Sequence, residues 1–202
     1  MRIRPVSLLI VTLGLTACGA SEPTRFYLLS PQPAGSAEHL AGPVVFVDQA
    51  TIAPYLDRAQ IVSRIAPDQV AFSDVRTWAE PVTSMITRYL VDGLGTRFGP
   101  DRVLETPARR DLVPDFRLAI DVQRFDGDQQ GLMVVDARWT LLAGADERFV
   151  ATGRERIEEP ADDPASWDAR VAALGRALSV LSERLGQTIA GRKGRRRRRA
   201  FR

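Results

Sequence analysis

Short apolar runs separated by polar turns dominate the first third of the chain. Four such runs, rich in β-branched and aromatic residues, occupy residues 25–30, 44–48, 60–64 and 69–73. This composition favours β-strands, because such side chains fit a pleated and partly buried surface. Residues 53–57 lie between two of these runs and include a proline, which predicts a turn or a single helical turn.

A different spacing begins at Val82. Apolar residues then recur three and four positions apart, at Val82, Met85, Ile86, Tyr89, Leu90 and Leu94. This period predicts an amphipathic helix that starts near Glu80, with Pro81 in its first turn. We expect the helix to end where glycines accumulate, between residues 93 and 99.

Alternation of apolar and polar residues marks two later segments, 116–123 and 133–141, and a third strand is expected over 148–157. A period of two is typical of strands with one buried face and one face in water. Polar turns over 126–131 and near Gly144 separate the segments. Because the turns are short, the sequence predicts an antiparallel meander of three strands.

A second stripe with helical spacing follows the meander. Its members are Trp167, Val171, Leu174, Leu178, Leu181 and Leu185. Asp163 is the predicted N-cap, with Pro164 at the first helical position. Such a stripe either covers the protein's own sheet or pairs with a helix of a partner, and we expect it to cover the sheet.

The order of these elements predicts the fold class. Strands, one helix, three strands and a final helix indicate an α+β fold. We expect a single domain over residues 25–190, with two α-helices packed on one face of a largely antiparallel sheet. The chain shows no internal repeat.

The N-terminus has the layout of a bacterial export signal. Arg2 and Arg4 precede a mostly apolar run over 6–15, which is shorter than the roughly 20 residues of a bilayer-spanning helix. The run ends in Leu-Thr-Ala-Cys at 15–18, which resembles the lipobox of bacterial lipoproteins, and Cys18 is the only cysteine. The alternative is a buried N-terminal helix with an incidental thiol.

The lipobox resemblance implies three segments before the domain. Residues 1–17 would be a signal peptide, Cys18 would be the lipidated first residue of the mature protein, and residues 18–24 would be a polar tether. The covalent lipid on Cys18 is then the only non-protein group that we expect. A disulfide within the chain is excluded, because no second cysteine exists.

The formal net charge of +3 hides an uneven distribution. Residues 191–202 hold eight basic residues and no acidic ones, and residues 1–17 hold two more basic residues. Removing these ten from the 28 basic residues leaves 18 against 25 acidic residues, so residues 18–190 carry a formal charge of −7.

We expect residues 191–202 to be a disordered Arg-rich tail, since a block of like charges repels itself. The alternatives are contact with an anionic lipid surface, which attracts polybasic segments, and nucleic-acid binding, which export disfavours. The arginines that would make the anionic-surface contact are Arg195, Arg196, Arg197, Arg198 and Arg199.

Nothing in the sequence indicates catalysis. His39 is the only histidine and lies in a Pro-rich segment, so it has no second histidine with which to build a metal site. The acidic pairs at 158–159 and 162–163 flank a proline and do not match a calcium loop. A Gly-x-Ser-x-Gly nucleophile motif is also missing. We therefore expect a protein that is not an enzyme and holds no metal.

Bulky residues in two connecting segments are candidates for a partner or self-association surface, because aromatic and Arg side chains often anchor interfaces. The alternative is that they pack beneath their own loops. The candidates are Tyr55, Leu56, Asp57, Arg58, Trp78 and Glu80.

Several of these features occur together in one known family. The lipobox is followed by Phe-Tyr-Leu-Leu at 26–29, by Tyr-Leu-Asp-Arg-Ala-Gln-Ile-Val-Ser-Arg at 55–64, and by Trp-Ala-Glu-Pro at 78–81, which opens a helix. In this order the chain resembles the ABC-type transport auxiliary lipoprotein family, the paraquat-inducible protein C-like group, over residues 15–190. The Arg-rich end has no counterpart in the family pattern.

The resemblance implies an outer-membrane lipoprotein on the periplasmic face. It would be a non-catalytic accessory to an MCE-domain periplasmic protein that moves lipids between membranes and supports membrane integrity. Gly19 after the cysteine is compatible with outer-membrane sorting. The alternative is a stand-alone structural or assembly-factor lipoprotein, for lipopolysaccharide export or outer-membrane assembly. Self-association into a symmetric oligomer is a further hypothesis.

Overall fold

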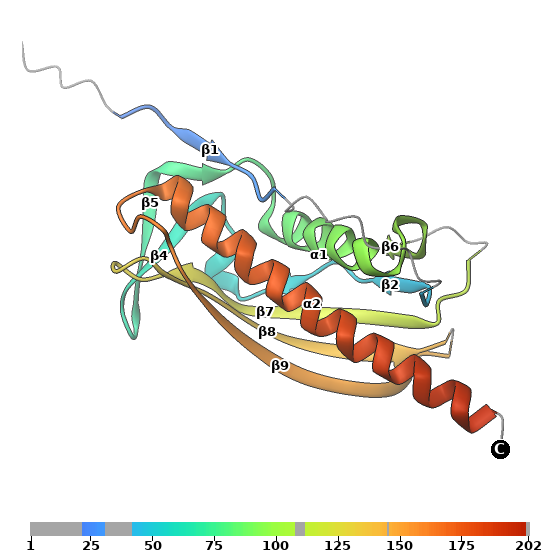
Figure 1. Ribbon diagram of the computed structural model, residues 1–202. Helices are drawn as coiled ribbons and strands as arrows, with labels where there is room; N and C mark the ends of the chain where they lie inside the picture. The colour runs from blue at the N-terminus through green and yellow to red at the C-terminus, as the bar shows by residue number, and fades with distance from the viewer. Residues whose placement is uncertain (1–21, 31–41, 108–111, 145, 201–202) are drawn as a thin grey trace, which may run out of the picture.

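The computed structural model describes residues 22–30, 42–107, 112–144 and 146–200, with side chains through residue 193. Within these ranges a curled nine-stranded sheet carries two α-helices on one of its faces (Figure 1). The predicted single α+β domain with both helices on one side of the sheet is confirmed.

Three long strands form the body of the sheet. They are β7 (Phe116–Gly127), β8 (Leu132–Ala143) and β9 (Arg148–Pro160), and each pairs antiparallel with the next along nearly its whole length. In Figure 1 they bend together beneath the helices. The predicted meander is therefore confirmed, and its strands extend beyond the predicted bounds.

The other edge of β7 is shared by three short strands in succession. β2 (Val45–Val47) pairs with the start of β7, β3 (Thr51–Ile52) with its middle, and β4 (Gln60–Ala66) with its end at Gly127. Beyond β2 lies β6 (Val103–Glu105), and beyond β4 lie β5 (Gln69–Trp78) and then β1 (Arg25–Tyr27). Two single helical turns, η1 (Pro54–Leu56) and η2 (Pro100–Arg102), complete the connections.

This arrangement corrects the predicted largely antiparallel sheet. The pairs β1–β5, β2–β6, β2–β7, β3–β7 and β4–β7 are all parallel, so the sheet is mixed. The parallel pairs join strands that are far apart in the sequence. Their direction depends on the crossing connections between them, which local alternation of apolar and polar residues does not record.

Both predicted helices are present, and both stripes are buried apart from Trp167, which is partly buried. Helix α1 (Val82–Phe98) and helix α2 (Trp167–Ala200) pack against each other and against the sheet. The hydroxyl of Tyr89 on α1 donates to the carbonyl oxygen of Gly175 on α2 at 2.7 Å. The α2 stripe therefore covers the protein's own sheet, as expected.

The helix ends differ in detail from the predictions. Pro81 precedes α1 as its N-cap and is not part of its first turn. At α2 the cap is Ser166, whose hydroxyl accepts a hydrogen bond from the backbone N–H of Ala169, while Asp163 makes a turn before it. The backbone of α2 continues through Ala200, so residues 191–200 extend the helix where a disordered tail was predicted.

Candidate functional site

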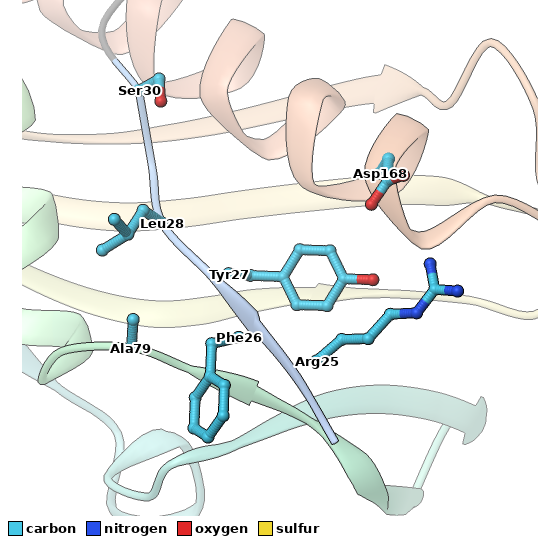
Figure 2. Close-up of a pocket in the computed structure, with 7 residues that line it drawn as sticks. All are labelled: Arg25, Phe26, Tyr27, Leu28, Ser30, Ala79 and Asp168. Carbon is cyan, nitrogen blue, oxygen red and sulfur yellow. The ribbon is translucent and has the colours of Figure 1, made fainter. Parts of the chain in front are cut away.

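A hollow lies along the edge strand β1. We call it the β1 groove; its volume is about 590 Å³. Figure 2 shows the first turn of α2 facing β1 across it. The residues that line it are Arg25, Phe26, Tyr27, Leu28, Ser30, Ala79 and Asp168.

The two faces of β1 have different environments. Tyr27 is buried and points toward α2, where burial and then the negative charge of Asp168 raise the pKa of its hydroxyl. Phe26 and Leu28 point away from Tyr27 and are 70% and 49% exposed. A strand places successive side chains on opposite faces, so burying Tyr27 turns its apolar neighbours outward.

Cation–π contacts hold the start of α2 beside this strand. The guanidinium carbons of Arg76 on β5 and Arg170 on α2 lie 5.3 and 5.2 Å from the ring centroid of Trp167. Arg170 also donates to the carbonyl oxygen of Pro164 at 2.8 Å. The far wall of the β1 groove is therefore fixed in place by the sheet and by its own helix.

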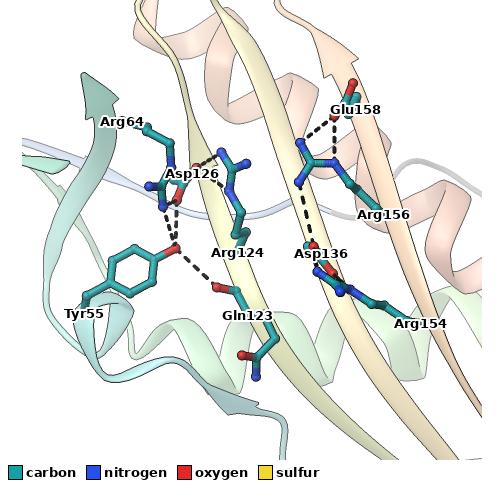
Figure 3. A network of polar contacts seen from close by, with 9 residues as sticks. All are labelled: Tyr55, Arg64, Gln123, Arg124, Asp126, Asp136, Arg154, Arg156 and Glu158. Carbon is teal, nitrogen blue, oxygen red and sulfur yellow. Dashed lines mark hydrogen bonds and ion pairs between the residues drawn. The ribbon is translucent and has the colours of Figure 1, made fainter. Parts of the chain in front are cut away.

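A second constellation lies on the sheet face away from the helices, where Asp126 is fully buried (Figure 3). Arg124 donates to its Oδ1 at 2.6 Å, and Arg64 donates to its Oδ2 at 3.1 Å. The hydroxyl of Tyr55 donates to the same Oδ2 at 2.8 Å. Burial opposes the charge on Asp126, but these hydrogen bonds outweigh it and lower the pKa of the carboxyl group.

A matching carboxylate, Asp136, lies on the neighbouring strand. Arg154 on β9 binds it with two hydrogen bonds, at 2.8 and 2.6 Å, and these bonds lower the pKa of the Asp136 carboxyl group. Arg156 approaches it at 3.8 Å and pairs with Glu158 at 2.6 Å. The Asp126 cluster therefore joins η1, β4 and β7, and the Asp136 cluster beside it joins β8 and β9.

This network is suited to holding strands together more than to proton transfer. Both carboxylates are ionised and saturated with arginine donors, so neither is poised near neutral pH as a general base. Burial and the hydrogen bond to Asp126 raise the pKa of Tyr55 far above its usual value, so its hydroxyl stays protonated. Among the described residues, no group of three or more His, Cys, Asp or Glu side chains could hold a metal ion.

The structure separates the predicted partner-surface residues into two groups. Leu56 and Trp78 are 3% and 6% exposed and belong to the core, where Trp78 packs against Phe125 with ring centroids 5.8 Å apart. Both residues are therefore packed inside the domain, which agrees with the alternative considered for them. They offer no surface to a partner in this conformation.

The other four residues have individual roles. Tyr55 is part of the Asp126 network, and Glu80 pairs with Arg88 at 2.7 Å. Asp57 is exposed, and Arg58 places its guanidinium carbon 3.7 Å from the ring centroid of Phe72. Arg58 also donates to the carbonyl oxygen of Tyr55 at 3.0 Å. The use of these exposed residues as a partner surface stays a prediction.

The remaining predicted sites fall partly outside the described residues. Cys18 and His39 lie in ranges that the structure does not describe, and so do the side chains of Arg195–Arg199, although their backbone continues α2. The acidic pairs near Pro160 are explained by arginine: Glu158 binds Arg156, while Glu159 and Asp162 lie 3.8 and 3.3 Å from Arg176.

Sequence reasoning missed the exposed apolar pair Phe26 and Leu28 and the buried carboxylates. The sequence predicts a strand at residues 25–30 but does not show which side chains face the core. The run contains four large apolar residues in succession, so no alternation distinguishes the two faces. Asp126 was assigned to a polar turn. The one available signal was the pair of arginines at alternate positions 154 and 156, which suits a carboxylate buried on the neighbouring strand.

Comparison with known proteins identifies the family. A model of the ABC-type transport auxiliary lipoprotein component matches residues 27–186, which is most of the chain. The protein belongs to this family. The family resemblance expected from the motifs is confirmed.

Solved structures support the fold. A crystal structure of an uncharacterized protein superposes with a TM-score of 0.70 at 19% identity, covering 83% of this chain and 99% of the other. Protein XCC0632 from Xanthomonas campestris gives a TM-score of 0.68 at 24% identity, covering 85% of this chain and 99% of the other. A search of curated proteins gave no significant match.

Family membership makes the protein an auxiliary lipoprotein component of an ABC-type transport system. A lipoprotein of such a system is a membrane-anchored protein of the cell envelope. None of the helices within the described residues is both long and apolar enough to cross a membrane.

Proposed function

We propose that this auxiliary lipoprotein is anchored by lipid on Cys18 to the periplasmic face of the outer membrane. There it serves as a non-catalytic accessory to an MCE-domain protein that carries lipids between the two membranes. It contributes to membrane integrity by joining that carrier to the outer membrane.

One observation carries this proposal. The family match begins at residue 27, nine positions after the single cysteine in its lipobox. The matched domain thus starts shortly after the proposed anchor. A tether this short would keep the domain close to the bilayer surface. The ionised, arginine-bound carboxylates of the Asp126 network agree with a supporting role and not with a catalytic one.

The anchor is tested by intact mass and by fractionation of the cell envelope. We expect the mature protein to begin at Cys18 and to carry the added mass of acyl chains. The Cys18→Ala variant should lose both the cleavage and the outer-membrane fractionation. An unmodified thiol on an uncut chain would contradict the proposal.

The partner is tested by crosslinking in intact cells, followed by purification of the full-length lipoprotein. We expect an MCE-domain protein among the crosslinked products, identified by mass spectrometry. The Cys18→Ala variant, displaced from the membrane, is the control and should lose this product. Capture of a barrel assembly protein instead would favour the assembly-factor function.

A further inference from the structure

We propose that the outward face of β1, formed by Phe26 and the adjoining Leu28, rests in the headgroup region of a phospholipid bilayer. The proposal rests on the proposed function, because it requires the lipid on Cys18. It adds a second point of contact between the protein and its membrane, which we call the β1 membrane face.

The segment between Cys18 and Glu22 is too short to let the domain move far from the bilayer. Glu22 accepts a hydrogen bond from Arg76 of β5 at 2.9 Å, so the chain before β1 is held against the sheet. Only three residues lie between Cys18 and Glu22, so four Cα–Cα steps join them. Fully extended, four steps span at most about 14 Å. The bilayer surface must therefore lie close to this end of the sheet.

The domain is much longer than this tether. Helix α2 has 34 residues, and a helix of that length spans about 50 Å. Its first turn faces β1 across the groove, while its other end lies far from β1 (Figure 1). A tether of about 14 Å therefore holds the β1 end of the domain at the membrane, while the far end of α2 is not held there.

The exposed side chains at β1 also suit a membrane interface. Phe26 and Leu28 are large apolar groups that water covers in the free protein, at 70% and 49% exposure. Exposed aromatic and aliphatic side chains settle at the membrane interface, with the apolar groups below the headgroups. Arg25 lies on the other face of the strand, beside Tyr27 (Figure 2), so the apolar pair carries this contact.

Other exposed aromatic residues differ from Phe26 in one of these respects. The ring of Phe72 is covered by the guanidinium group of Arg58 at 3.7 Å. Phe149 is 67% exposed but lies at the start of β9, at the end of the meander away from β1 (Figure 1). Phe149 is therefore a matched control, with equal exposure and no tether nearby.

The experiment uses the full-length lipoprotein reconstituted into vesicles of phosphatidylethanolamine and phosphatidylglycerol. Cys18 is the only cysteine, so once it is lipidated an engineered cysteine is the only free thiol. Phe26→Cys and Phe149→Cys are each labelled with an environment-sensitive fluorophore. Bromine-labelled lipids then quench the dye according to its depth.

We expect quenching at position 26 to exceed that at position 149 at least threefold, with a blue-shifted emission at position 26 only. Both sites are exposed, so neither substitution threatens the fold. Equal quenching at the two positions would overturn the β1 membrane face. If each chain then carries a single label, Cys18 is blocked by lipid and the anchor is still supported. Two labels per chain would reveal an unmodified Cys18 and would overturn the anchor and the membrane face together.

Discussion

The buried carboxylate of Asp126 shows how single residues hold this sheet together. It joins η1 through Tyr55, β4 through Arg64 and its own strand through Arg124. A buried charge is stable only when its partners replace the water that it loses. Removing it would leave two arginines directed at an empty acceptor position.

We predict that Asp126→Asn lowers the free energy of unfolding by about 3 kcal/mol at pH 7. The matched control is Asp121→Asn on the same strand, where the carboxylate is only partly buried and binds Thr51 and Gln123. We expect the control to cost less than about 1 kcal/mol. Equilibrium urea denaturation measures both, and equal losses in the two variants would contradict the assigned role.

The same residue predicts a pH dependence with a definite sign. Because the folded-state pKa of Asp126 is lowered, its stabilising contribution is complete above the ordinary carboxyl pKa and is lost as pH falls toward the folded value. The stability difference between wild type and Asp126→Asn should therefore shrink below about pH 4. A difference that stayed constant to pH 2.5 or so would show that the charge is not responsible.

At the scale of elements, the contact between the two helices depends on a glycine. A Cβ atom placed on Gly93 of α1 would lie 2.5 Å from the hydroxyl oxygen and 3.0 Å from the Cβ of the buried Ser182 on α2. Two helices approach this closely only where one of them lacks a side chain. Gly191 also lies in α2, and a Cβ there meets nothing within 4 Å.

We predict opposite effects of the same substitution at these two glycines. Gly93→Ala should destabilise the protein by about 1–2 kcal/mol, since overpacking outweighs the gain in helix propensity. Gly191→Ala, the control, should be neutral or stabilise by up to about 1 kcal/mol. Combining Gly93→Ala with Ser182→Ala should recover part of the loss. Thermal denaturation of the four proteins tests this, and a stabilising Gly93→Ala would contradict the packing described.

For the whole molecule, the β1 membrane face and the Arg-rich end impose different orientations. The first turn of α2 lies beside β1, so the helix carries residues 191–200 about 36 to 50 Å along its axis from that turn. With β1 on the bilayer and α2 directed away from it, Arg195–Arg199 cannot reach the same membrane. These arginines would reach the membrane only in a different orientation, with the axis of α2 parallel to the bilayer surface.

We therefore predict that deleting residues 191–202 leaves the lipid quenching at position 26 unchanged in low salt. Wild type and deletion are compared in the same phosphatidylglycerol vesicles, each labelled through Phe26→Cys. Phe149→Cys should stay unquenched in both. A marked fall in quenching at position 26 would show instead that the arginines contact the bilayer and tilt the domain onto it.

The long elements of this fold were predictable from the sequence, and the short strands and their directions were not. Both helices and the β7–β9 meander were predictable, because each repeats one spacing over eight or more residues and buries the resulting face. β3 and β6 were missed, because two or three residues contain no period. The parallel pairs were missed because direction depends on connections that cross the sheet.

The candidate site was less predictable than the fold. Leu56 and Trp78 look like surface anchors in the sequence, and only the packing of η1 and β5 against the core shows that they are buried. Asp126 looks like a turn residue, and only the approach of Arg64 and Arg124 makes its burial possible. Each outcome depends on contacts between residues that are distant in the chain.

The sequence by itself determined the family, the helices, the meander and the position of the cysteine ahead of the domain, because these depend on local spacing and short motifs. Only the tertiary structure decided which apolar side chains are buried and which face outward. Burial is set by the surfaces that meet in space, so Trp78 lies in the core while Phe26, whose strand has only one neighbour among the described strands, faces the solvent.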